Sequence, residues 1–437
     1  MTASVKGLFD FIRNAPTPYH AVETISGMLR ENGFFELKEG KRWSLTPGGK
    51  YYVTRNRSSV LAFVLPTDGS YNGFQIVASH CDSPTFKIKS NAEIVVRKEY
   101  VQLNTERYGG MLCAPWMDRP LSVAGRVLVQ EKNGVSTRLV NIDKDMVLIP
   151  NVAIHMNRTA NDGIKYNAQV DMLPLYGDGN ASGGFMKEIA AAAGVEEEKI
   201  LDTDLFLYNR QPGTVWGANE EYISSPKLDD LECAYTSLQA FLTCVPEKLK
   251  SIPMCCVFDN EEVGSTTKQG ADSTFLYDTL RRITLALGKD EEELYTAIAA
   301  SVMLSADNAH SVHPNHPEYT DPTNQVFMNK GIVIKYNANQ KYTTDGVSGA
   351  IFRSICGKAG VPTQTFFNRS DMLGGSTLGN ISNSHVSLNT IDIGLAQLAM
   401  HSSYETAGAK DVDYMIDGIA AFFNSSVTTE QDGEYHF

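Results

Sequence analysis

The sequence lacks any apolar run long enough, about 18 residues, to cross a membrane. Its seven cysteines are scattered without a Cys-x-x-Cys pair, which argues against a disulfide framework and against a zinc–thiolate site. Residues 1–16 mix apolar and polar side chains, unlike the continuous apolar segment of a signal peptide. We therefore expect a cytoplasmic protein with reduced thiols and no membrane partner.

Positive charge is scarce, because 38 Lys and Arg residues face 51 Asp and Glu residues, for a formal net charge of −13. Phosphate contacts need clustered basic side chains, so nucleic acid is not an expected partner. The chain also has no Gly-x-Ser-x-Gly elbow, Walker loop, His-Glu-x-x-His helix or dinucleotide fingerprint. These absences argue against the four kinds of catalytic site that those motifs build.

Apolar runs of strand length alternate with helical patterns at both ends of the chain. Residues 1–90 and 222–437 show this α/β rhythm. Residues 91–221 instead consist mostly of short β-like runs, among them 93–101, with one helical pattern at 185–193. We predict an α/β domain, built from the first and last of these segments, that is interrupted by a β-rich insertion.

Three of the apolar runs end in side chains able to bind a metal ion. In open α/β sheets, ligand sites collect at the C-terminal ends of the strands, so these side chains are predicted to lie together. Two adjacent glutamates at the end of a buried strand are costly unless something positive faces them. The runs and the residues that follow them are 74–79 with His80 and Asp82, 254–258 with Glu261 and Glu262, and 303–305 with Asp307.

Taken one at a time, the candidate residues have ordinary structural explanations. His80 suits a capped strand end, and Asp229 suits the N-cap of the helix that follows it. A single histidine near the end of a chain, such as His401, is more often structural than a metal ligand. His313 is followed by Pro314, which opposes the helix that would align it with its neighbouring histidines, so we interpret it as a loop residue.

Longer motifs add weight to the candidate site. They are Ala15-Pro16-Thr17-Pro18-Tyr19-His20-Ala21-Val22, Ser79-His80-Cys81-Asp82-Ser83-Pro84, Trp116-Met117-Asp118-Arg119, Ile149 to His155, Asp259 to Gly264, Ser305 to Pro314, and Leu398 to Ser402. In this order, the motifs closely resemble the aspartyl aminopeptidase family of zinc metallopeptidases over nearly the whole chain. The resemblance implies an α/β catalytic domain with a mixed sheet and helices on both faces, interrupted by a β-rich dimerisation domain.

The resemblance also implies a role for each candidate site residue. The family hydrolyses the N-terminal residue of peptides with two divalent ions per subunit, expected to be zinc, with manganese and cobalt as alternatives. A cis peptide bond is expected after the bridging aspartate. By motif, Asp229 would bridge the ions, His80 and Asp307 would complete one site, Glu262 and His401 the other, Glu261 would be the general base, and Asp82 would support His80.

Substrate preference and assembly rest on the resemblance alone. Lys330 would supply the cation that an N-terminal Asp or Glu requires, although a surface-loop lysine explains it equally well. A two-metal amidohydrolase of similar fold or an aminopeptidase that prefers neutral residues is therefore the alternative. A non-catalytic shell protein is opposed by the complete set of ligands. The resemblance implies a twelve-subunit shell built from dimers, in which His155 reaches the active site of a neighbouring subunit.

Overall fold

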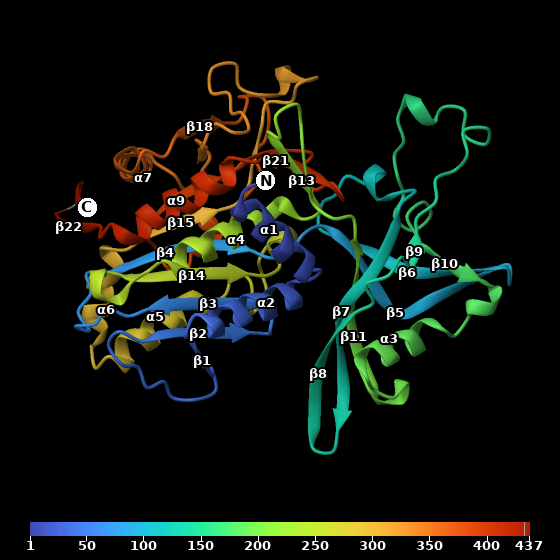
Figure 1. The fold of residues 1–437 in the computed structure, drawn as a ribbon, viewed down its shortest axis with the longest axis horizontal. Helices are drawn as coiled ribbons and strands as arrows, with labels where there is room; N and C mark the ends of the chain where they lie inside the picture. The colour runs from blue at the N-terminus through green and yellow to red at the C-terminus, as the bar shows by residue number, and fades with distance from the viewer. Residues whose placement is uncertain (432) are drawn as a thin grey trace.

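The computed structural model describes residues 1–431 and 433–437 and has the predicted mixed α/β fold (Figure 1). Its largest sheet has nine strands in the order β1-β2-β3-β14-β4-β15-β19-β17-β18. The strands are β1 (Phe35–Leu37), β2 (Lys50–Arg55), β3 (Ser59–Val64), β14 (Ile252–Phe258), β4 (Phe74–His80), β15 (Val302–Ala306), β19 (Asn389–Gly394), β17 (Ile332–Tyr336) and β18 (Thr363–Phe367).

Helices cover both faces of this sheet, which explains why its central strands are buried on both faces and mostly apolar. Along β3, Val60 and Ala62 join one apolar core, whereas Leu61 and Phe63 join the other. The first core is completed by α1 (Ala3–Asn14), α2 (Pro18–Glu31), α4 (Leu228–Leu242), α7 (Gly346–Ala359) and α9 (Asp411–Asn424). The second is completed by α5 (Phe275–Ala286), α6 (Glu291–Ala299) and α8 (Leu378–Ser382).

A second, seven-stranded sheet lies to one side of the first and encloses its own apolar core (Figure 1). Strand β11 pairs with β5 on one edge and with β7 on the other, so the sheet closes into a barrel. The strands are β5 (Thr85–Val96), β6 (Tyr100–Tyr108), β7 (Pro120–Glu131), β8 (Gly134–Asn141), β9 (Val147–Leu148), β10 (Leu175–Asp178) and β11 (Ile200–Asn209), with α3 (Phe185–Ala193) beside them.

The barrel strands lie between the two α/β segments of the chain, where the insertion was predicted. The predicted boundary at residue 91 falls inside β5, and the segment 91–221 stays a proposed domain. The predicted strand at 93–101 is wrong, because the chain reverses between β5 and β6. Arg97 and Lys98 form this turn with φ values of 51° and 65°. Such turns usually contain Gly or Asn, and neither residue is here to mark the reversal.

A five-stranded sheet continues from the C-terminal ends of β15 and β19. Its strands are β12 (Thr214–Trp216), β13 (Tyr222–Ser225), β21 (Glu405–Gly408), β20 (Ala396–Leu398) and β16 (Ala309–His310), and the hairpin β22 (Thr428–Gln431) and β23 (Glu434–His436) is separate. Short 3-10 helices lie at Ala114–Trp116, Ala160–Asp162, Gly179–Ala181, Glu197–Lys199, Pro246–Lys248, Glu261–Val263 and Pro317–Tyr319. Within the described residues, every helix is too short or too polar to span a membrane.

Candidate metal centre

Three neighbouring parallel strands bring the predicted ligands together at one edge of the large sheet. Strand β4 lies between β14 and β15 and runs parallel to both. His80 is the last residue of β4, Asp307 follows β15 directly, and Glu261 begins the short helix that follows β14. The structure therefore assembles these side chains at the C-terminal ends of the strands, as the sequence pattern predicted.

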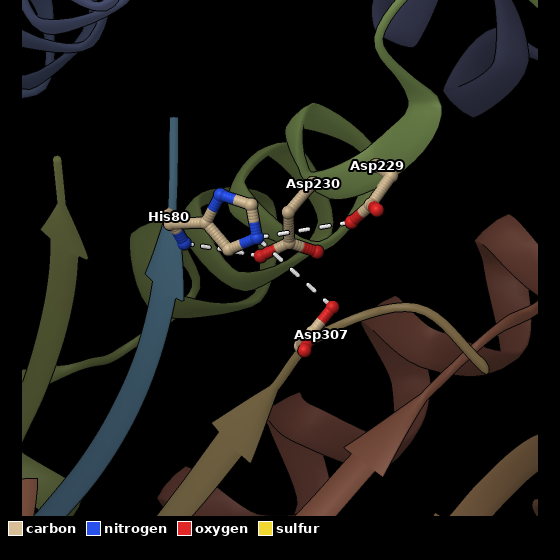
Figure 2. Close-up of side chains that lie close together, drawn as sticks. All are labelled: His80, Asp229, Asp230 and Asp307. Atoms are coloured by element: carbon tan, nitrogen blue, oxygen red, sulfur yellow. Dashed lines mark hydrogen bonds and ion pairs between the residues drawn. The ribbon is translucent and has the colours of Figure 1, made fainter. Parts of the chain in front are cut away.

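Asp229 lies between two histidines and points one carboxylate oxygen toward each. Its Oδ1 is 3.7 Å from Nε2 of His80, and its Oδ2 is 3.2 Å from Nε2 of His401. Oδ1 of Asp307 lies 4.0 Å from the same nitrogen of His80 (Figure 2). Oε2 of Glu262 lies 3.4 Å from Nε2 of His401. The five residues thus form two adjoining groups that share Asp229.

The start of α4 shows why Asp229 faces this centre. Its backbone and that of Asp230 are not helical, and the Asp229–Asp230 peptide bond is cis, as the resemblance predicted. The main-chain N–H of His80 donates to Oδ2 of Asp230 at 3.0 Å (Figure 2). Asp229 Oδ1 has no hydrogen-bond partner among the described residues, so capping of α4 does not explain this side chain.

The centre fits a divalent cation. At the centre, three carboxylate oxygens are buried without a hydrogen-bond partner among the described residues: Oδ1 of Asp229, Oδ1 of Asp230 and Oε1 of Glu262. Unpaired buried carboxylates are costly, and a positive ion among them removes that cost. Imidazole nitrogens and carboxylate oxygens are also ordinary zinc ligands.

The pKa values reflect this crowding of buried acids. Burial raises the pKa of Glu261 to about 8, opposed by His80 and assisted by Asp307. Burial and the nearby Asp229 raise the pKa of Glu262 well above its usual range. Burial alone would raise the pKa of Asp229 too, but the hydrogen bond from His401 and the charge of His80 outweigh it and lower the pKa. Of these three acids, Asp229 is therefore the one whose surroundings favour the carboxylate form.

Asp82 organises the residues around His80. Its main-chain oxygen lies 3.1 Å from Nδ1 of His80, and its Oδ1 lies 3.3 Å from the same nitrogen. The carboxylate also accepts the main-chain N–H groups of Glu261 and Glu262, each at 3.1 Å, and the Tyr108 hydroxyl at 2.8 Å. One buried carboxylate thus orients a histidine and both glutamates, which is the kind of support that metal ligands usually receive.

Comparison with known proteins identifies the family. The model of the aminopeptidase I zinc metalloprotease family, M18, matches residues 11–423. The chain belongs to the M18 family. A curated relative, the probable M18 family aminopeptidase 2 of Clostridium acetobutylicum, is 46% identical over 426 residues, which cover 96% of this chain and 98% of the relative. The chain is accordingly an aminopeptidase of a zinc metalloprotease family, as predicted from its motifs.

Solved M18 structures share the fold. In the cryo-EM structure of the complex of Ape4 and Nbr1, the matching chain has a TM-score of 0.92 and 34% identity, over 96% of this chain and 85% of that one. The S. cerevisiae mApe1 dodecamer matches with a TM-score of 0.84 and 28% identity, over 96% of this chain and 95% of that one. The combination of sheet and barrel is therefore an M18 architecture.

Two predicted substrate residues lie outside the centre of this M18 subunit. His155 is exposed in the long loop between β9 and β10, which rises from the barrel (Figure 1). Lys330 is exposed in the turn before β17. Neither residue is in hydrogen-bond or ion-pair contact with the metal-ligand candidates in the described residues.

A different lysine reaches the centre. Lys335, in β17, is 2% exposed, and its Nζ lies 3.6 Å from Oδ2 of Asp307. It donates to the main-chain oxygens of Asp307 and Asn308 at 2.8 Å and 3.3 Å. Burial alone would lower the pKa of Lys335, but the charge of Asp307 outweighs it and raises the pKa. An apolar strand pattern gave no reason to single out this lysine.

Sequence reasoning also missed Tyr108 and Glu405. Tyr108 lies at the end of a barrel strand and links the barrel to Asp82. Glu405 begins β21, and its carboxylate accepts the main-chain N–H groups of Asp229 and His401. A single acidic residue four positions after His401 was the available signal for Glu405, and that spacing carries no chemical meaning by itself.

Proposed function

We propose that this M18 aminopeptidase holds two zinc ions and removes an N-terminal Asp or Glu residue from peptides. The single observation that carries the two-ion part is the position of Asp229, with one carboxylate oxygen toward each of two histidines. A carboxylate bridges two metal ions about 3.5–4 Å apart, which an imidazole cannot do. We assign His80 and Asp307 to one ion, Glu262 and His401 to the other, and Asp229 to both; manganese and cobalt are the alternative metals.

Glu261 is the proposed general base. When bound, the ions supply Lewis acidity, which polarises the peptide carbonyl and makes water more acidic. Glu261 lies in one group with His80 and Glu262, whose potential ligand atoms are within 4.8 Å of one another. Its carboxylate takes a proton from the water that adds to the carbonyl carbon. It returns that proton to the leaving amine as the C–N bond breaks.

Asp82 supports the different roles of Glu261 and Glu262. Because Asp82 accepts the main-chain N–H groups of both Glu261 and Glu262, the two glutamates keep a constant relative position. Glu262 is then committed to an ion, and Glu261 stays free to carry the proton. Adjacent carboxylates with different environments commonly take on such different roles.

For the preference for acidic residues, we propose Lys335 rather than Lys330 as the cation. Lys335 is buried beside Asp307, and two of its three donors are used by main-chain oxygens. Among the described residues, its third N–H has no acceptor within hydrogen-bond distance, since the Asp307 carboxylate oxygen is 3.6 Å away. A substrate carboxylate at this position would gain a charge-assisted hydrogen bond in a site shielded from water. The exposed Lys330 offers a much weaker contact.

A peptide assay with two lysine variants tests the function. Wild-type protein supplied with zinc is expected to hydrolyse N-terminal Asp and Glu peptides faster than Leu peptides. Lys335→Met should lower kcat/KM for the acidic peptides by about 10- to 100-fold, because a hydrogen bond to a charged group contributes about 1.5–3 kcal/mol. Leu hydrolysis should change little, and the matched variant Lys330→Met should behave as wild type.

The other outcomes of this assay separate the alternatives. A wild-type preference for Leu would favour the neutral-residue aminopeptidase and contradict the acidic pocket. Equal losses on Asp and Leu peptides in Lys335→Met would mean that this lysine supports Asp307 instead. A folded, zinc-loaded protein without any peptidase activity would favour the non-catalytic shell.

We also propose a homo-oligomer, a dodecamer built from dimers, in the cytoplasm. The mApe1 relative is a dodecamer, and the exposed loop with His155 projects where a neighbouring subunit can meet it. The cytoplasmic location is supported by the seven cysteines, all of them free. If His155 completes a neighbour's site, activity in gel-filtration fractions should follow the assembled species, and His155→Ala should lower kcat without disassembly. A fully active monomer would contradict this arrangement.

A further inference from the structure

A buried carboxylate joins two ligand candidates that belong to distant parts of the chain. Glu405 is 2% exposed and lies at the start of β21. Its Oε1 accepts the main-chain N–H of His401 at 2.7 Å, and its Oε2 accepts the main-chain N–H of Asp229 at 3.0 Å. Both carboxylate oxygens are therefore used, one on each ligand residue.

No basic side chain pairs with Glu405 in the described part of the chain. A buried carboxylate that has main-chain N–H groups as its partners is unusual, because burial of a charge normally requires a counter-charge. One of these hydrogen bonds stabilises the backbone conformation of His401. This residue has a φ of 65°, in the left-handed region that favours glycine, and the hydrogen bond to Glu405 holds it there.

Asp82 and Glu405 each hold the main chain of two different residues of the centre. Asp82 holds the main chain of Glu261 and Glu262, whereas Glu405 holds that of Asp229 and His401. Together, the two carboxylates fix every residue assigned to the ion between Asp229, Glu262 and His401. The geometry of that ion's ligands then depends on Glu405 at two of the three positions.

We propose that Glu405 is a positioning residue that aligns Asp229 and His401 for the ion they share, a role that rests on the proposed two-ion site. A glutamine at this position would have nearly the same size but one acceptor oxygen. Its amide N–H groups would face one of the two main-chain N–H groups, so either Asp229 or His401 would lose its anchor. The ion held by His80 and Asp307 has ligands that Glu405 does not touch, apart from Asp229.

The test is zinc binding by chelator-treated full-length protein, followed by calorimetry and by metal analysis. In Glu405→Gln, affinity for one of the two zinc ions should fall by about 10- to 100-fold, the usual effect of losing a group that orients metal ligands. Affinity for the other ion should fall less, because Asp229 is the one ligand assigned to that ion that Glu405 contacts. Circular dichroism would check that the variant is folded before titration.

Asp411→Asn is the matched control. Asp411 is also a fully buried carboxylate that accepts two main-chain N–H groups, those of Asn329 and Gly331, but it touches no ligand candidate. This variant should lose thermal stability and still bind two zinc ions with wild-type affinity. A loss of zinc affinity in both variants, equal for both ions, would indicate a general structural role and overturn the proposal.

Glu405→Asp keeps the inference testable if the glutamine variant does not fold. It retains the charge and both oxygens but shortens the side chain by one methylene, so a smaller loss at the same single ion is expected. Wild-type affinity for both ions in either folded variant would overturn the role of Glu405. If the wild-type protein itself binds fewer than two zinc ions, the proposed two-ion centre fails instead.

Discussion

Replacing Glu261 by glutamine is expected to lower kcat by about 100- to 10,000-fold while zinc binding stays intact, because general-base catalysis typically contributes a factor of that size. The glutamine keeps the size of the side chain, and Asp82 still holds its main-chain N–H. What it loses is the ability to take a proton from water. Steady-state kinetics on an N-terminal Asp peptide, together with metal analysis of the same sample, measures both quantities.

Glu262→Gln is the comparison that gives this result its meaning. The two glutamates are adjacent and both only partly exposed, but Glu262 faces His401 and is assigned to an ion. This variant should lose zinc affinity as well as turnover, whereas Glu261→Gln should lose turnover alone. Near-normal turnover in Glu261→Gln would remove Glu261 from the role of base. Loss of zinc in that variant would make Glu261 a ligand.

Removal of metal is expected to abolish hydrolysis, and added zinc to restore it. Bound at the proposed centre, the ions would contribute several kcal/mol of transition-state stabilisation, so a loss of about 1,000-fold or more in kcat/KM is expected. Zinc should also raise the melting temperature, since a ligand that binds the folded chain alone stabilises it. Kinetics and thermal unfolding before and after dialysis against chelator would record both effects.

Asp229→Asn should prevent this restoration. The amide has one oxygen and no charge, so it cannot supply an anionic oxygen to each of the two histidine groups. Zinc content should fall below that of wild type, and activity should not recover at zinc concentrations that restore wild type. Recovery of full activity in Asp229→Asn would contradict a shared aspartate. The distant Asp411→Asn variant controls for loss of a buried carboxylate.

Much of the fold and of the site was accessible from local patterns. The run 74–79 is mostly apolar, is buried along its whole length and ends at His80, and it forms β4 at the centre of the sheet. The run 254–258 behaves in the same way before Glu261. Such runs indicate buried parallel strands because helices cover both faces, and the polar residue that follows each run must lie at the strand's C-terminal end.

The pairing of strands that are distant in the sequence could not be predicted from the sequence. The chain order does not reveal that β14 inserts between β3 and β4, or that β11 closes the barrel by pairing with both β5 and β7. Each strand has two edges, and the partner at each edge is selected by the packing of the whole sheet rather than by the strand's own residues.

Lys330 and Lys335 illustrate the same division for the site. Both lie in one short segment, and motif position favoured Lys330. The structure exposes Lys330 and buries Lys335 beside Asp307. The local sequence shows that a lysine is present, but it does not show whether the strand that carries the lysine lies next to the centre. A buried cation is stable only when an anionic group lies beside it.

The sequence by itself indicated the kinds of candidate ligand, the order of the motifs, the α/β rhythm and, through the resemblance to aspartyl aminopeptidases, the cis bond after Asp229. The tertiary structure alone decided the partners of each ligand. Glu405 reaches Asp229 because β21 pairs with β13, whose chain leads into α4. It reaches His401 because β21 begins a few residues after β20 ends, and the two strands pair. Metal ligands are set by residue type, which is local. Their alignment is set by hydrogen bonds between strands, and those exist only once the sheets have formed.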